Sequence, residues 1–265
     1  MIGRPVRHSL SPVLHNAAFR ALDLDWAFVA FDVAAGQGAL AIEAMRVLGV
    51  QGLSVTMPHK QAAAAAVDEL APAAERLGVV NTVVRRGTTL VGENTDGAGL
   101  LNALRLDEGF EPRGRSCLVA GAGGAARAVI LALAQAGAAE VVVANRTPER
   151  AAEAVALAPG VARVGALEEV GDADLVVNAT PLGMVSHAGL PLDPGRLHAG
   201  QLVVDLVYQP AVTPLVAAAR EQGAVAVNGL GMLIHQAALA FQHWTGMEPP
   251  LEVMSAAAVA RLTHR

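Results

Sequence analysis

Cysteine and aromatic residues are scarce in this chain. Cys117 is the single cysteine among 265 residues, so no disulfide can form within the chain. A lone cysteine fits a reducing compartment, and we expect the protein in the cytoplasm. Aromatic residues make up only 3%, and no basic run or basic patch mixed with aromatic residues occurs. Together with a net charge of −5, this argues against nucleic acid as a partner.

Long apolar stretches are also missing, although hydrophobic residues make up 53% of the chain and the mean hydropathy is +0.42. Every stretch of about 18 residues contains charged or turn-forming residues, so no membrane-spanning helix is expected. The first residues, MIGRPVRHSL, lack the apolar core of a signal peptide. Most of the hydrophobicity comes from alanine and valine, which is typical of a parallel sheet covered by helices.

Strands and helices are predicted to alternate in two series. In the first, strands are expected at residues 26–33, 52–57, 79–85 and 89–92, and helices at 12–22, 38–48 and 58–70. The segment Arg86-Gly87-Thr88 would join the last two strands as a hairpin. In the second, strands are expected at 117–120, 140–144, 174–178, 202–206 and 224–227, with helices such as 125–136 and 148–156 between them.

This alternation predicts an α/β fold of two domains with right-handed crossovers. The polar segment 107–115 contains glycine and proline and is a plausible linker. Two further helices are expected at 232–246 and 251–263. We therefore expect a mostly parallel α/β domain over residues 1–106, joined by C-terminal helices at about 236–265, and a doubly wound, Rossmann-like domain over 107–235.

A glycine-rich turn follows the first strand of the second series. Residues 118–127, LVAGAGGAAR, fit the pattern G-x-G-x-x-A, with Ala126 in place of a third glycine. Bare backbone here lets a pyrophosphate approach the start of the next helix, where N–H groups have no helical partner. A tight strand-to-helix turn needs glycine anyway, but the flanking strand and helix favour dinucleotide binding. The predicted contacts are Gly121, Ala122, Gly123, Gly124 and Ala125.

The tip of the next strand indicates which dinucleotide is bound. A site selective for NAD usually has Asp or Glu there to hold the ribose 2′-hydroxyl, and this tip has neither. It carries Asn145, Arg146 and Thr147, with Arg150 close behind. A guanidinium matches a 2′-phosphate in charge and geometry, so NADP is the predicted cofactor. The alternative for Arg146 is a solvated loop arginine.

Later strands of a doubly wound sheet also end beside the ligand. This position adds further candidate cofactor contacts, each of which could equally be a structural turn. They are Thr180, Leu206, Gly229 and Met232.

Lys60 lies at the start of an alanine-rich helix, in the segment SVTMPHK. Pro58 suits the first helical position, which would place Lys60 in the first turn. A cation at this end of a helix is disfavoured by roughly 0.3–1 kcal/mol. An amine in such a position suits proton transfer. A solvated surface lysine is the alternative when Lys60 is considered alone.

Short motifs along the whole chain resemble those of the shikimate dehydrogenase family, in the family's order. They are GRP at 3–5 with HSLSP at 8–12 and His15-Asn16, VTMPHK at 55–60, VNT at 80–82, NTDG at 94–97, the glycine turn at 120–127, NRT at 145–147, and GLGM at 229–232 with Gln236. The resemblance implies reversible, NADPH-dependent reduction of the ketone of 3-dehydroshikimate to shikimate.

The resemblance also assigns roles to individual residues. Lys60 and Asp96 would form the catalytic pair, Lys60 giving a proton to the developing alkoxide while Asp96 holds the ammonium and a neighbouring hydroxyl. The expected substrate contacts are Ser9 and Ser11 at the carboxylate with Tyr208 nearby, and Thr56, Asn81 and Gln236 at the ring hydroxyls. The helix that carries Gln236 should pack onto the first domain.

Structural interpretations of some of these residues remain open. Asp96 precedes an apolar helical run and could be a helix N-cap, as could Ser11, which precedes Pro12. Asn81 in a strand could bond the backbone. The histidines form no HxxxH or HxH pair, so no metal is implied, and His8, His15 and His59 are expected to pack or cap.

The chain departs from the family pattern at a few positions. It begins only two residues before Gly3, so the family's first strand is expected to be short. Ser54 stands where Asn is frequent, and Ala71-Pro72 interrupts the usual helix before Val80.

Several alternative functions stay open. A relative that also uses quinate or aminoshikimate is the first, and a non-catalytic NADP(H) sensor is the second, although a sensor needs no proton donor such as Lys60. An enzyme like methylene-tetrahydrofolate dehydrogenase also pairs a lysine with a Rossmann domain, but Ser9 and Ser11 do not suit its substrate. The expected partner is a small-molecule substrate, without nucleic acid or membrane, and the protein is expected to be a monomer or homodimer.

Overall fold

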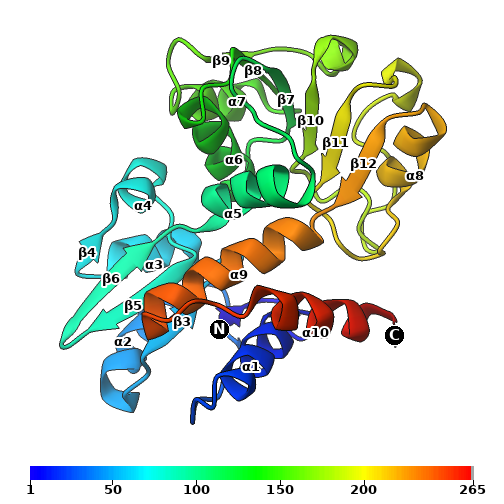
Figure 1. Cartoon of the computed structure of the whole chain (residues 1–265). Helices are drawn as coiled ribbons and strands as arrows, with labels where there is room; N and C mark the ends of the chain where they lie inside the picture. Colours follow the sequence, from blue (N-terminus) through cyan, green and yellow to red (C-terminus); the bar gives the residue numbers. More distant parts are fainter. Residues whose placement is uncertain (264–265) are drawn as a thin grey trace. The chain divides into compact units, whose positions relative to one another are not determined.

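The computed structural model describes residues 1–263 and divides the chain into two compact units (Figure 1). The first comprises Met1–Thr95 and the residues from Ile234 onward, and the second comprises Asp96–Leu233. Both units combine sheets with helices, so the predicted α/β class is confirmed. By packing, Asp96 and the helix that it begins belong to the second unit, whereas the sequence placed the boundary at residue 106.

The first unit contains two small sheets. Its strands are β1 (Ile2–Gly3), β2 (Phe31–Asp32), β3 (Gly52–Ser54), β4 (Glu69–Leu70), β5 (Thr82–Arg86) and β6 (Thr89–Glu93). β1 pairs in parallel with β2, and a four-stranded sheet has the order β3-β5-β6-β4. β4 and β6 are parallel, whereas β3–β5 and β5–β6 are antiparallel. Arg86 pairs with Thr89, so the predicted hairpin is confirmed and accounts for the antiparallel part of this mixed sheet.

The helices of the first unit are α1 (Ser11–Ala21), α2 (Gly38–Leu48), α3 (Lys60–Ala66), α4 (Pro72–Leu77) and α10 (Leu251–Thr263), together with most of α9 (Leu230–Thr245). α1 and α10 pack side by side. No helix in residues 1–263 has both the length and the apolar character to cross a membrane.

Two predicted elements of this unit are much shorter in the structure than predicted. The helix predicted at 58–70 ends at Ala66, because Asp68 pairs with Leu90 of β6: the Asp68 N–H donates to the Leu90 carbonyl at 2.9 Å, and the Leu90 N–H donates to the Asp68 carboxylate at 2.7 Å. The strand predicted at 26–33 is reduced to β2, since the Asn16 side chain bonds both backbone groups of Phe28. Tertiary partners override local propensity in both places.

The second unit is built on six parallel strands. They are β7 (Ser116–Ala120), β8 (Glu140–Ala144), β9 (Ala162–Val164), β10 (Leu175–Asn178), β11 (Leu202–Asp205) and β12 (Val225–Asn228). Their order is β12-β11-β10-β7-β8-β9, which reverses direction between β7 and β10. This is the strand order of a Rossmann fold, and ligands bind where the order reverses. β9 was not predicted from the sequence.

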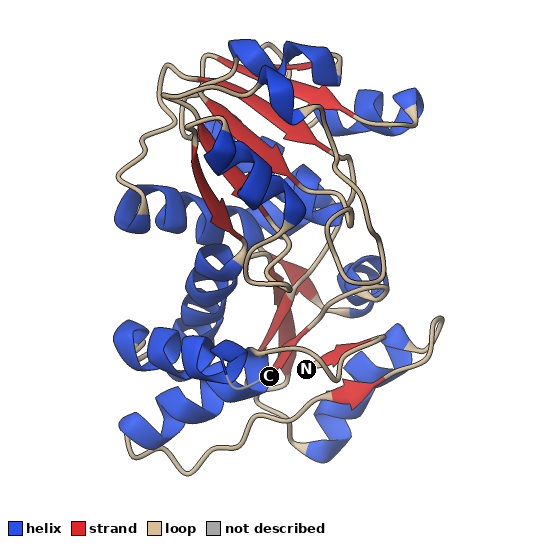
Figure 2. Ribbon diagram, turned by 90° about the vertical axis from the view of Figure 1, so that its right-hand side faces the viewer, coloured by secondary structure: helices blue, strands red, loops and turns tan. Residues whose placement is uncertain are grey.

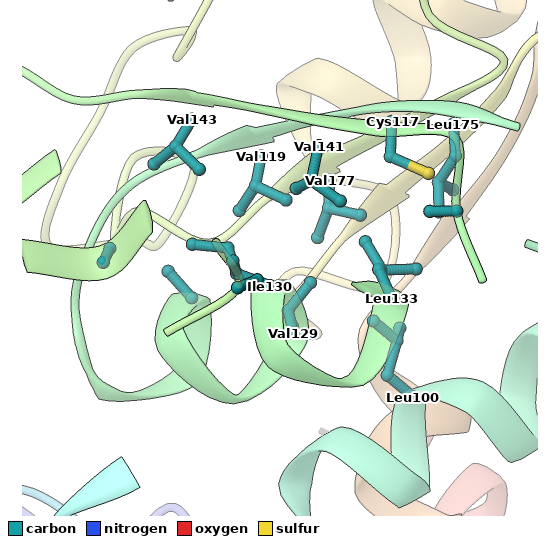
Figure 3. Packing of buried hydrophobic residues seen from close by; sticks show 14 of the residues in the cluster. Leu100, Cys117, Val119, Val129, Ile130, Leu133, Val141, Val143, Leu175 and Val177 are labelled. Carbon is teal, nitrogen blue, oxygen red and sulfur yellow. The ribbon is translucent and has the colours of Figure 1, made fainter. Parts of the chain in front are cut away.

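Helices cover both faces of this sheet (Figure 2). They are α5 (Asp96–Asn102), continued by the π-helical η1 (Ala103–Asp107), α6 (Gly124–Gln135), α7 (Pro148–Val155) and α8 (Pro214–Glu221), with the 3₁₀ turns η2 (Leu167–Asp172) and η3 (Pro194–Arg196). Alternate strand residues face opposite layers: Val119 packs with α5, α6 and α7, whereas Leu118 packs with α8 and η2. In Figure 3, Val129, Ile130 and Leu133 of α6 point toward the sheet. Burial of each large side chain contributes about 1.5–3 kcal/mol.

Two further features of the second unit follow from close packing. Cys117 is fully buried in this core, and its burial raises the thiol pKa to about 12, so the thiol stays protonated and unreactive. Gly97 lets α5 approach α6 closely, because a Cβ there would lie 2.8 Å from the Ala128 carbonyl oxygen and 2.9 Å from the Ala132 Cβ. The helix that begins at Asp96 is thereby fixed against α6.

An aromatic cluster in the first unit surrounds His15. Its ring stacks on Phe28 at 4.4 Å between centroids and lies 4.9 Å from the Trp244 ring of α9. The side chain is 1% exposed, and Nδ1 has no hydrogen-bond partner among the described residues. Burial, aided by the nearby N-terminal ammonium, lowers the pKa of His15 to about 3. The expectation that His15 is a packing residue agrees with these contacts.

The buried His15 should make stability depend on pH. Below the usual histidine pKa of 6.5, the unfolded chain binds a proton that the folded chain refuses until about pH 3. The free energy of unfolding therefore decreases as the pH is lowered through this window. His15 alone contributes about 1.4 kcal/mol per pH unit. Urea unfolding followed by tryptophan fluorescence between about pH 6.5 and 5 measures this slope, and His15→Phe should flatten it. An unchanged slope in the variant would contradict the assignment.

Candidate functional site

The glycine turn after β7 has the form of an anion site. Gly121 needs its positive φ of +113°, and a Cβ there would lie 3.0 Å from the Ala179 carbonyl oxygen. Gly123 is the N-cap of α6, and apart from adjacent residues and the helix's own backbone no described atom lies within 4 Å of a Cβ placed on Gly123 or Gly124. No side chain caps α6 and no acidic residue occupies its first turn, so its free N–H groups can receive a phosphate.

Arginines with no carboxylate partner follow the end of β8. The Asn145 side chain donates to the Thr147 carbonyl at 2.8 Å, and Thr147 is the N-cap of α7. Arg146 and Arg150 are exposed, and in residues 1–263 neither forms an ion pair. Arg163, by contrast, is held by Glu140 at 2.7 Å and Glu169 at 2.7 Å. The charge at this strand tip is thus available for a phosphate.

The neighbouring strands β10 and β11 end in a buried polar network. Asn178 and Asp205 are register partners, and both are 0% exposed. The Asn178 amide donates to the Asp205 carboxylate at 2.8 Å, and its oxygen accepts the Thr180 N–H at 3.0 Å and hydroxyl at 2.7 Å. The Thr213 hydroxyl, also 0% exposed, donates to Asp205 at 2.6 Å. Thr180, a predicted cofactor contact, is therefore held by Asn178, and Asn178 in turn by Asp205, neither of which was predicted as a site residue.

A signal for this network was available in the sequence. Three buried or partly buried apolar strands each end in a polar residue: LVVN in β10, LVVD in β11 and VAVN in β12. Burial raises the pKa of Asp205, although its hydrogen bonds from Thr213, Val207 and Asn178 act in the opposite direction.

The remaining predicted residues of this unit lie on the loops after β11 and β12. The Leu206 N–H donates to the Asn178 carbonyl at 2.9 Å, and Tyr208 is half-buried two residues later. A Cβ on Gly229 would overlap the Leu206 carbonyl, so glycine is needed where the two loops meet. Met232, in the first turns of α9, packs partly against the core. These residues all follow the carboxyl ends of the strands.

Lys60 of the first unit is the first residue of α3 and is half-buried. Its position in the first turn agrees with the prediction, but Pro58 does not begin the helix: His59 is the N-cap, and Pro58 follows a cis peptide bond. The His59 ring nitrogen Nε2 lies 2.9 Å from the Val33 carbonyl oxygen, and the Val80 N–H donates to the Lys60 carbonyl at 3.0 Å. The backbone around Lys60 is fixed on both sides.

Lys60 also stands out by composition. It is the only lysine in the chain, and the other 18 of the 19 basic residues are arginine. This signal was visible in the sequence. Since arginine does not lose its proton in proteins, Lys60 is the one cationic side chain of the Lys/Arg type that can act as an acid.

Asn81 is bonded reciprocally to Thr95. Its amide donates to the Thr95 hydroxyl at 2.9 Å, and the Thr95 N–H donates to the Asn81 oxygen at 2.9 Å. The Val55 N–H donates to the Asn81 carbonyl at 2.7 Å, and the Thr56 N–H donates to the Ile2 carbonyl at 3.0 Å. The ends of β1, β3 and β6 therefore gather beside the start of β5. Thr95, which belongs to the NTDG motif but was not predicted as a site residue, directly precedes the buried Asp96.

Ser9 and Ser11 lie together at the start of α1. Their hydroxyl oxygens are 3.2 Å apart, and the Ser11 N–H donates to Ser9 Oγ at 3.2 Å. Ser11 is the first residue of the helix and Leu10 is the N-cap, so the N-cap interpretation of Ser11 is wrong. The pair presents two hydroxyls at a helix start without an acidic residue in its first turn.

Gln236 is half-buried on the part of α9 that belongs to the first unit. Trp244, further along the same helix, donates from Nε1 to the Val83 carbonyl at 3.0 Å. The expectation that this helix packs onto the first unit is confirmed. In residues 1–263, no three side chains among His, Cys, Asp and Glu are arranged to hold a metal ion.

Family models match most of the chain. Residues 1–83 match the model described as shikimate dehydrogenase substrate binding domain. Residues 229–259 match the shikimate 5′-dehydrogenase C-terminal domain. Residues 116–209 match the model for NADP oxidoreductases that depend on coenzyme F420.

Individual relatives match over almost the full length. The chain is 48% identical to the shikimate dehydrogenase (NADP(+)) of Moorella thermoacetica, covering 96% of this chain and 90% of that protein. It is 39% identical, with a TM-score of 0.91, to the Thermus thermophilus shikimate 5-dehydrogenase solved with NADP(H) and shikimate, covering 98% and 97% of the two chains. It is 33% identical, with a TM-score of 0.89, to a Corynebacterium glutamicum quinate dehydrogenase solved with NAD, covering 98% and 97%. The chain therefore belongs to the shikimate dehydrogenase family.

Proposed function

We propose that the chain catalyses the reversible, NADPH-dependent reduction of 3-dehydroshikimate to shikimate, in the biosynthesis of aromatic amino acids. The near-full-length identity to a shikimate dehydrogenase (NADP(+)) supports this reaction. One structural observation supports the catalytic pair that this reaction requires. The adjacent residues Val80 and Asn81 hold the Lys60 backbone and Thr95, the residue before Asp96, so one dipeptide fixes both chain segments that bear the proposed catalytic pair.

In this mechanism Lys60 is the general acid. As hydride reaches the carbonyl carbon, the ammonium of Lys60 gives its proton to the carbonyl oxygen, so that the ketone becomes a secondary alcohol. Asp96 holds the ammonium and an adjacent ring hydroxyl through its carboxylate. In the reverse direction the neutral amine of Lys60 takes the hydroxyl proton.

Substrate orientation is assigned to a set of hydroxyl and amide side chains. Ser9 and Ser11 bind the carboxylate, which is supported by their hydroxyl separation of 3.2 Å, and Tyr208 lies near it. Thr56, Asn81 and Gln236 bind ring hydroxyls. These contacts fix which face of the ring receives hydride and bring the ketone to Lys60.

The cofactor supplies hydride when bound, and the residues present fit NADP. The open turn at Gly121, Ala122, Gly123, Gly124 and Ala125 receives the pyrophosphate, supported by the free space at Gly123 and Gly124. The 2′-phosphate binds at the strand tip formed by Asn145, Arg146, Thr147 and Arg150. The nicotinamide half lies along the loops with Thr180, Leu206, Gly229 and Met232.

A quinate-using enzyme of the same family is the alternative with a specific observation behind it, the 33% identity to an NAD-bound quinate dehydrogenase. The arginines after β8 favour NADP over the NAD that was bound to that relative. A non-catalytic NADP(H) sensor is disfavoured because Lys60 and Asp96 are both present. We propose that the enzyme works in the cytoplasm as a monomer or homodimer.

The proposed reaction predicts a defined pattern of activity. Purified protein should reduce NADP⁺ readily with shikimate, and far less well with quinate or with NAD⁺. Absorbance at the NAD(P)H band, measured for each of the four pairings of substrate and cofactor, gives the relative kcat/KM values. Quinate with NAD⁺ as the best pair would establish the alternative, and NADP⁺ binding without turnover on any pair would establish a sensor.

Lys60→Ala should abolish proton donation while leaving the substrate contacts intact. We expect kcat to fall by roughly 10²–10⁴-fold, the range for a general acid, with a much smaller change in KM for shikimate. Lys60→Arg is the matched variant, since it keeps the positive charge but cannot give up its proton. It should be nearly as inactive as Lys60→Ala. If Lys60→Arg retains wild-type kcat, Lys60 acts by charge alone.

Arg146→Ala should weaken recognition of the 2′-phosphate. Steady-state assays should show KM for NADP⁺ rising at least about tenfold, as expected for a lost charge-assisted contact, while KM for NAD⁺ changes little. Arg163→Ala is a suitable control, because Arg163 is already bound by Glu140 and Glu169. Equal effects of Arg146→Ala on both cofactors would reject the 2′-phosphate assignment.

A further inference from the structure

The last residues of four neighbouring strands form a row along the carboxyl edge of the second unit's sheet. Asn178 of β10 is in register with Ala120 of β7 on one side and with Asp205 of β11 on the other, and Asp205 is in register with Asn228 of β12. The glycine turn belongs to β7, in the half of the sheet that carries the pyrophosphate motif. Asp205 lies in the other half, which the proposed function assigns to the nicotinamide end of the cofactor.

Three donors converge on the Asp205 carboxylate. Its Oδ1 accepts the Asn178 amide at 2.8 Å and the Val207 N–H at 3.1 Å, and its Oδ2 accepts the Thr213 hydroxyl at 2.6 Å. An ionised carboxylate accepts from all three donors at once, whereas an asparagine could accept at one oxygen only and would turn its NH₂ group toward another of the three partners. Both oxygens of the Asp205 carboxylate therefore accept hydrogen bonds.

Through these bonds Asp205 is linked to the loop after β10 and to the loop after β11. It fixes the Asn178 amide, whose nitrogen also donates to the Leu182 carbonyl at 3.1 Å and whose oxygen holds Thr180 by two bonds. It also holds Val207, between Leu206 and Tyr208. The Thr213 hydroxyl links the same carboxylate to the start of α8, where it caps the Val216 N–H at 3.2 Å.

Stability alone does not account for a charge at this position. Asp205 is 0% exposed, and burial raises its pKa above the usual value. A carboxyl group with a raised pKa favours folding at low pH and opposes it once the pH exceeds that pKa, so the ionised group costs stability at neutral pH. Replacing a buried ion pair by well-packed apolar residues is often neutral or stabilising, so buried charge in general is weak evidence for a stabilising role. What the charge does provide is a single geometry for the two loops.

We propose that Asp205 is a positioning residue for hydride transfer, which acts through Asn178 to fix Thr180 and through Val207 to fix the Leu206–Tyr208 loop at the nicotinamide end of the cofactor. This inference rests on the proposed NADP-dependent reaction. It assigns a role to a residue that touches neither substrate nor cofactor.

Asp205→Asn tests the proposal with two ligands that differ only at the nicotinamide end. The first is NADP⁺, and the second is 2′-phospho-ADP-ribose, which lacks nicotinamide. We expect kcat with shikimate to fall by about ten- to a hundredfold, as for a small misplacement of reacting groups. The Kd of 2′-phospho-ADP-ribose, measured by calorimetry, should stay within about twofold of the wild-type value, because the glycine turn and Arg146 are untouched.

Arg146→Ala provides the opposite pattern as a control, with weaker binding of 2′-phospho-ADP-ribose. Wild-type kcat in Asp205→Asn would overturn the proposal, even if that variant unfolds at a lower temperature. Equal loss of affinity for both ligands would also overturn it, since Asp205 would then support the whole domain rather than one end of the site.

A second pair of variants decides the matter if Asp205→Asn does not fold. Thr213→Val removes the hydroxyl donor to Asp205 at nearly constant volume, whereas Thr213→Ser keeps it. We expect kcat to fall severalfold in Thr213→Val and to be restored in Thr213→Ser, with binding of 2′-phospho-ADP-ribose unchanged in both. Equal kcat in the two variants would contradict the proposal. The wild-type assay with shikimate and NADP⁺ tests the proposed reaction separately. If the wild-type protein shows no turnover, the proposed reaction is refuted. The comparison of affinities for the two ligands would still show whether Asp205 supports the nicotinamide end of the site.

Discussion

The reciprocal bonds between Asn81 and Thr95 are the constraint on which the proposed chemistry of the first unit depends. They close the hairpin of β5 and β6 just beyond its last ladder pair, Thr82 with Glu93. Residues beyond a ladder have backbone groups that lack a strand partner and must find another. Here the Asn81 side chain supplies both a donor and an acceptor. Val80 next to it donates to the Lys60 carbonyl, so the same segment also holds the first residue of α3.

In the second unit, backbone groups beyond the ends of the parallel strands are also bonded by polar side chains. Asn178 and Asp205 terminate buried apolar strands and satisfy the backbone of the loops that follow. Both units thus use a buried, fully bonded polar side chain at the end of a strand to fix a loop that carries proposed site residues. Such networks specify one geometry when every member is satisfied, which suits a reaction that depends on placing groups within a fraction of an ångström.

Local patterns in the sequence predicted those parts of the molecule that local physics determines. The glycine turn, α6 and the C-terminal helix α10 follow from motifs or periodicity within one segment, and α10 has the predicted bounds of 251–263. The helix predicted at 58–70 failed because Asp68 bonds Leu90, a partner 22 residues away. The partners of Thr95 and Thr213 could not be predicted for the same reason, since their bonds to Asn81 and Asp205 span 14 and 8 residues. A sequence motif can identify a candidate residue, but its hydrogen-bond partners from distant parts of the chain are known only from the fold.

Arginine and lysine have different uses in this chain, because arginine keeps its positive charge whereas lysine can lose a proton. Arginines form the multiple, directional ion pairs of the surface, as Arg46 does with Asp68 at 2.8 Å and Arg163 does with Glu140 and Glu169. A planar guanidinium suits these pairs because it keeps its charge and binds in a fork. The same properties make arginine useless as a proton donor. In a chain whose other basic residues are all arginine, the single lysine stands at the start of α3, held by Val80 and flanked by His59. Its amine is the only Lys or Arg side chain that can readily lose a proton, which agrees with the proposed role of Lys60 as the proton donor.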